Sequence, residues 1–106
     1  MFEAKQLTEH GKIYLEAANL LEKKGWCQNH SSNIFDQICL AEALHRSVYG
    51  SQESVNMNKV SDVRAWNPSF VALSKFIGED VIRWNDTHGR TKAEVIEKLR
   101  EAAYNP

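Results

Sequence analysis

The stretch that decides the fold is IRWNDTHGRTKAEV, residues 82–95, in which a polar segment separates two apolar runs. Thr91 and Glu94 have the spacing of a helix-capping box, in which the threonine hydroxyl and the glutamate carboxylate each accept a backbone N–H from the other residue. Asn85 and Asp86 are typical of a tight reversal, because their side chains bond readily to nearby backbone. The stretch therefore predicts a turn followed by the start of a helix.

Apolar residues recur at helical spacing on both sides of this turn. The first helix should end at Gly25 in a Schellman cap, with Trp26 folded over Leu21. Asn67 and Pro68 are typical of a helix cap and the residue that follows it. The segment DVIRW, residues 80–84, fits either an extended piece or a helical turn. Four principal helices are predicted, at residues 8–24, 33–49, 68–77 and 92–104.

The second predicted helix follows the polar segment CQNHSSN, residues 27–33. Ser32 or Asn33 can cap it. Ile34 and Phe35 then begin its apolar stripe, which we expect to face the core.

The composition indicates one globular domain, residues 1–106, with 42% hydrophobic and 25% charged residues. The helices are short and unequal, so we expect an all-α, compact and irregular orthogonal bundle of about four helices, not a coiled coil. No apolar run approaches the length of a membrane span, and the N-terminus lacks a signal-peptide pattern. We therefore expect a cytoplasmic protein with no membrane partner.

The charge balance does not indicate nucleic-acid binding, because thirteen Lys and Arg face fourteen Asp and Glu. Two cysteines, Cys27 and Cys39, are too few for a disulfide framework. With His30 and His45 they resemble a zinc ligand set, but Cys39 and His45 lie six apart on a predicted helix, about 120° around its axis. We expect free thiols, no metal, no cofactor and no catalytic residues.

Three pieces of the sequence resemble a family of small, mostly helical proteins of unknown function from bacteria and their phages. These are GWCQ (25–28), CLAEAL (39–44) and RWND with GRT and EV (83–95). The chain departs from that pattern at Glu42, where glycine is common, and at Thr87-His88, where Ala-Pro is common. The second departure weighs against a shared catalytic role for His88. The resemblance implies a helical fold and a phage or prophage context, and no mechanism.

The RWND and GR residues form the best candidate ligand site. Arg83 and Arg90 could clamp an anion, Asn85 and Asp86 could bond a polar ligand, and Trp84 could stack on it. The structural alternative places Trp84 in the core and pairs Arg90 with Asp86 across the turn.

The polar middle segment carries four spaced apolar residues, Met57, Val60, Val63 and Trp66. Such anchors are typical of a protein-binding hot spot, and they could equally cover one edge of the core. We therefore expect a protein-interaction or regulatory module with a protein partner, such as a phage accessory protein acting on a host protein. The alternative is a small-molecule or nucleotide-binding protein, conceivably a minor enzyme, that uses the Arg83–Arg90 turn.

Overall fold

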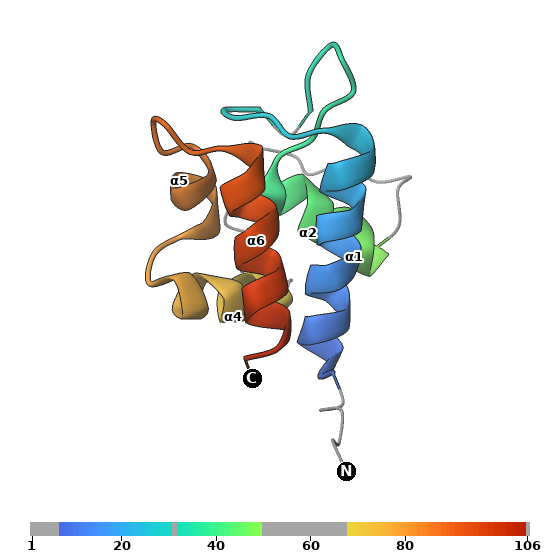
Figure 1. Cartoon of the computed structure of the whole chain (residues 1–106), viewed down its shortest axis with the longest axis vertical. Helices are drawn as coiled ribbons and strands as arrows, with labels where there is room; N and C mark the ends of the chain where they lie inside the picture. The colour runs from blue at the N-terminus through green and yellow to red at the C-terminus, as the bar shows by residue number, and fades with distance from the viewer. Residues whose placement is uncertain (1–6, 31, 50–67, 106) are drawn as a thin grey trace.

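The computed structural model describes residues 7–30, 32–49 and 68–105, and every named element within them is a helix (Figure 1). The predicted all-α fold is therefore confirmed. None of the described helices is both long enough and apolar enough to cross a bilayer. The elements are α1 (Glu9–Lys24), α2 (Leu40–Tyr49), α4 (Pro68–Ile77), α5 (Val81–Asn85) and α6 (Lys92–Ala103).

Helices α1 and α6 run side by side in opposite directions, and α4 lies across them (Figure 1). A glycine permits the close approach of the first pair. A Cβ built on Gly11 would lie 2.7 Å from the carbonyl oxygen of Ala103, so any larger residue would push the two helices apart. The far ends of the described chain are thus packed together.

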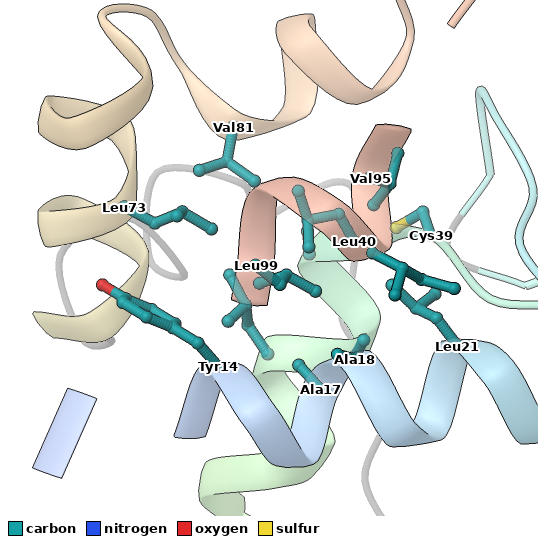
Figure 2. Packing of buried hydrophobic residues seen from close by; sticks show 14 of the residues in the cluster. Tyr14, Ala17, Ala18, Leu21, Cys39, Leu40, Leu73, Val81, Val95 and Leu99 are labelled. Carbon is teal, nitrogen blue, oxygen red and sulfur yellow. The ribbon is translucent and has the colours of Figure 1, made fainter. Parts of the chain in front are cut away.

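The core lies between these helices, where aliphatic side chains from α1, α2, α4 and α6 meet (Figure 2). Leu21, Leu40 and Leu99 are fully buried at its centre. Tyr14 lies at one side and donates its hydroxyl to the carbonyl of Ser69 at 2.9 Å. Burial raises the pKa of Tyr14 to about 12.

The helix boundaries at both ends of the chain follow the sequence signals. Thr8 caps α1 by accepting from the N–H of Gly11 at 3.0 Å. Thr91 and Glu94 form the predicted capping box of α6. Pro68 is the first residue of α4. The cap predicted at Asn67 lies outside the described residues.

The prediction for the second helix is wrong at its start, because α2 begins at Leu40 and not at residue 33. Ile34 and Phe35, expected to face the core, are 93% and 74% exposed. The physical reason is that the Asn33 side chain bonds to backbone N–H groups within a turn, which competes with helix formation. Asp36 then takes a positive φ of 61°, which breaks any helical run.

The exit from α1 also differs from the predicted Schellman cap. Gly25 has the expected positive φ of 90°, but its ψ of 166° sends the chain onward in an extended direction. Trp26 consequently forms a parallel β-bridge with Ile38. The short bridge brings the start of α2 back beside the end of α1.

Candidate functional site

A turn at residues 86–91 joins α5 to α6. Asp80 caps α5, and its Oδ1 accepts from the backbone N–H groups of Ile82 at 3.0 Å and Arg83 at 3.3 Å. Residues 80–84, which fitted either an extended piece or a helical turn, are thus the cap and the first four residues of a short helix. Gly89, with φ 86°, turns the chain toward α6.

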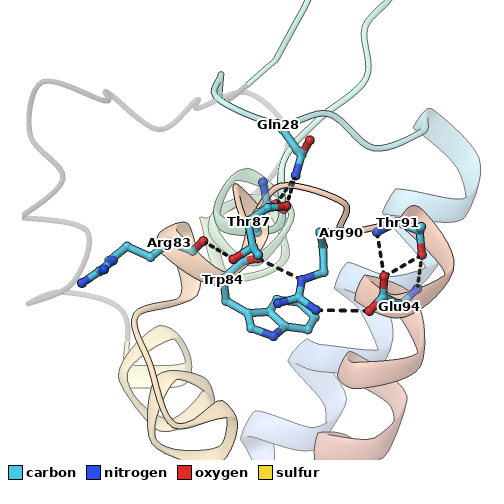
Figure 3. Close-up of polar contacts among 8 residues, drawn as sticks. Gln28, Arg83, Trp84, Thr87, Arg90, Thr91 and Glu94 are labelled. Carbon is cyan, nitrogen blue, oxygen red and sulfur yellow. Dashed lines mark hydrogen bonds and ion pairs between the residues drawn. The ribbon is translucent and has the colours of Figure 1, made fainter.

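Trp84 and Arg90 form one stacked unit on the core side of this turn (Figure 3). Trp84 is buried, and the guanidinium of Arg90 lies 4.1 Å from the centre of its ring. Arg90 also donates through Nε to the Trp84 carbonyl at 3.0 Å and forms an ion pair with Glu94 at 3.2 Å. The guanidinium is therefore engaged on three sides, by partners other than the Asp86 that the structural alternative had suggested.

Arg83 is exposed and points away from Arg90 in Figure 3. The two arginines therefore do not converge as drawn.

Asn85 sits at the centre of a buried polar junction and is 1% exposed. Its Oδ1 accepts from the indole N–H of Trp26 at 2.6 Å and from the backbone N–H of Leu40 at 3.1 Å. Its Nδ2 donates to the carbonyl of Cys27 at 3.2 Å and to Asp86 Oδ1 at 2.9 Å. All four hydrogen-bonding positions of the amide are therefore used within the protein.

The segment after α1 completes this junction. Gln28 Nε2 donates to the carbonyls of Asn85 and Thr87, both at 2.9 Å (Figure 3). The backbone N–H of Asn29 donates to Asp86 Oδ1 at 2.9 Å. The GWCQ and RWND pieces, nearly sixty residues apart, thus form the two sides of this buried polar junction.

The two cysteines are buried free thiols. The Cys27 thiol donates to the carbonyls of His30 and Gln37, both at 3.4 Å. Burial raises the pKa of the Cys27 thiol, and nearby carboxylates raise it further. Cys39 is more deeply buried, with a pKa of about 12, and its sulfur accepts from the N–H of Glu42 at the start of α2. Both thiols are poor nucleophiles at neutral pH.

One face of α2 carries a buried ion pair. Glu42 is fully buried and pairs with Arg46 one turn later, so its buried charge is compensated on the same helix. The ring of His45 packs against Tyr49, and its buried Nε2 has no hydrogen-bond partner within the described part of the chain. Among the described residues, no group of three or more His, Cys, Asp or Glu side chains is placed to hold a metal ion.

The loop at residues 33–37 is the exposed feature that sequence reasoning missed. It projects beyond the ends of the helices, at the top of Figure 1. Asn33 Oδ1 accepts from the N–H groups of Phe35 at 3.0 Å and Gln37 at 3.1 Å, and the N–H of Asp36 donates to the Asn33 carbonyl at 3.0 Å. Ile34 lies beside Phe35 at the tip. The missed signal was the turn-forming pair of residues 33 and 36 on either side of these two apolar side chains.

The four residues expected to contact a partner, Met57, Val60, Val63 and Trp66, lie outside the described residues. Their placement therefore stays a prediction.

Comparison with known protein families gives a match over nearly the whole chain. Residues 6–105 match a family of unknown function, DUF6197. The chain belongs to this family. No curated protein and no solved structure matches. The expected membership of a family without an assigned function is thus confirmed, while the family motifs and an origin in bacteria and phages stay predictions.

Proposed function

We propose that this protein is a binding module that acts through contact with a protein partner, and that the 33–37 loop makes the contact. The observation that carries the proposal is the exposure of two consecutive large apolar residues of the loop, Ile34 and Phe35, which are 93% and 74% exposed. Large apolar side chains grouped in this way are characteristic of protein-binding surfaces.

The internal hydrogen bonds of the loop support the same proposal. Asn33 and Gln37 are joined by backbone and side-chain bonds, including Asn33 Nδ2 to Gln37 Oε1 at 2.8 Å. The ion pair between Lys24 and Asp36 ties the loop to the end of α1. A loop that is already ordered loses little conformational entropy on binding, so more of the contact energy becomes affinity.

The alternative function, ligand binding at the Arg83–Arg90 turn, has less support from the geometry. The polar groups of Asn85 and Arg90 are already engaged within the protein. A ligand would have to replace these bonds and would gain correspondingly less.

The partner in this proposal is a host protein in the cytoplasm, and the chain is a phage or prophage accessory protein. The family resemblance supports the phage context. The two free buried thiols are compatible with a reducing compartment.

The test is affinity capture from a lysate of the source organism, comparing the native chain with an Ile34→Ser/Phe35→Ser variant. The variant should fold with an unchanged or slightly higher melting temperature, because both side chains are exposed, yet lose the bound protein. Tyr104→Ser is the matched control, since Tyr104 is a 55% exposed aromatic on another surface. Recovery of the same proteins by all three chains would refute the proposal.

A further inference from the structure

We infer that the partner surface is a concave, uncharged apolar pocket, into which the 33–37 loop inserts Ile34 and Phe35. This inference rests on the proposed function and specifies the kind of partner. Its first basis is shape, because the backbone of the loop projects beyond the helices (Figure 1) and its two apolar residues are exposed. A projecting pair of side chains is desolvated fully only by a surface that surrounds it.

The backbone of the loop directs the contact to side chains. The N–H groups of Asn33, Phe35, Asp36 and Gln37 all donate to acceptors inside the loop. A partner strand that adds to an exposed edge needs free backbone donors on that edge. Recognition therefore depends on the apolar side chains and not on strand pairing.

The one charged side chain of the loop, Asp36, is neutralised by a lysine of this protein, so the partner's pocket does not need to supply a charge. Asp36 pairs with Lys24, and the hydrogen bond from that lysine lowers the pKa of the aspartate. The tip thus presents apolar surface beside a neutral ion pair. A charged group inside the receiving pocket would be buried without a partner, which is costly.

A second copy of this chain is a poor occupant because the area is too small. An aromatic side chain buries on the order of 200 Å², so two loop tips meeting symmetrically would bury roughly 600 Å² in all. A stable dimer needs about 1,200 Å² or more. A pocket that also encloses the sides of the loop gains further area from one copy.

A bilayer is also a poor occupant. The chain has a net charge of −1, so no general attraction draws it to an anionic membrane. Two inserted side chains resemble a single weak anchor, and stable anchoring takes a second signal. This occupant is therefore an outcome that the experiment must exclude.

The experiment places the photo-crosslinking residue p-benzoylphenylalanine at Phe35 in the full chain, expressed in the source organism. The matched control carries it at Tyr104. We expect position 35 to give adducts to another protein at least tenfold more often than position 104, and the adducts to lie on apolar residues lining a concavity. For the purified partner, Phe35→Ala and Ile34→Ala should each weaken binding at least tenfold, whereas Tyr104→Ala should change it less than twofold.

Each other outcome overturns the inference. Adducts chiefly to a second copy, to lipid, or to a flat or charged protein surface would name a different occupant. A captured partner that crosslinks only from position 104 would refute both the inference and the proposed contact by the 33–37 loop, and would leave only protein binding through another surface. If no protein is captured or crosslinked from either position, the proposed function fails together with the inference.

Discussion

Replacing Asn85 by alanine should cost this protein about 3–5 kcal/mol of unfolding free energy. The substitution leaves the N–H of Leu40 and the carbonyl of Cys27 buried without their amide partner. Each buried unsatisfied group costs about 1–3 kcal/mol, and the space left by the amide adds to this. The indole of Trp26 is only partly buried, so water can replace its lost acceptor. The expected loss is a large fraction of the roughly 5–15 kcal/mol typical of a domain.

The assay is urea unfolding at neutral pH, followed by circular dichroism and tryptophan fluorescence. Asn85→Ala should shift the unfolding midpoint strongly without changing the slope. A decrease in unfolding free energy of less than about 1 kcal/mol would show that the buried polar junction does not hold the two segments together, and would refute this reasoning.

Asn85→Asp separates the roles of the two amide atoms. The new carboxyl keeps an acceptor for Leu40 and Trp26 but directs an oxygen at the carbonyl of Cys27 and at Asp86. Burial and this repulsion favour the protonated acid, so its pKa should be raised in the folded state. Stability should then be highest below the unfolded pKa of about 4 and fall as pH rises through the raised folded value. A pH-independent difference from the native chain would contradict the argument.

Three further outcomes are expected. Arg90→Gln should lower the unfolding free energy by about 1–2 kcal/mol, because a cation–π contact and a hydrogen bond are lost. Arg83→Gln should change the unfolding free energy by no more than about 0.5 kcal/mol. Equal effects of the two substitutions in urea titrations would contradict the stacked arrangement. The pKa of Glu94 is lowered mainly by the helix-cap backbone N–H, so its stabilising effect is present above the unfolded pKa of about 4.3 and lost as pH falls through the folded value. Glu94→Gln should therefore flatten the acid-induced loss of stability relative to Glu97→Gln, and parallel pH curves would count against it. Because burial raises the pKa of Cys39 to about 12, a thiol reagent should label this cysteine rapidly only in denaturant; fast labelling of the native chain would refute its burial.

Local signals predicted α1, α4 and α6 because the decisive interactions at their ends span only a few residues. The capping box of α6 is the clearest case, since Thr91 and Glu94 are three residues apart and both bonds form as predicted. The predicted start of α2 was wrong for a related reason. Asn33 can cap a helix or close a turn with equally local bonds, and the choice between them depends on the pairing of Trp26 with Ile38, which no local pattern contains.

The candidate site shows the same division between local and distant information. The residue types around Asn85 suit both a ligand site and a turn. What distinguishes these interpretations is the set of groups that arrives from residues 26–29 and from Leu40, all more than forty positions away. These groups fill the hydrogen-bonding positions of the amide, so its polar atoms are engaged within the protein. Ile34 and Phe35 lie outside α2 and remain exposed in the 33–37 loop. This loop is the surface through which we propose that the protein acts.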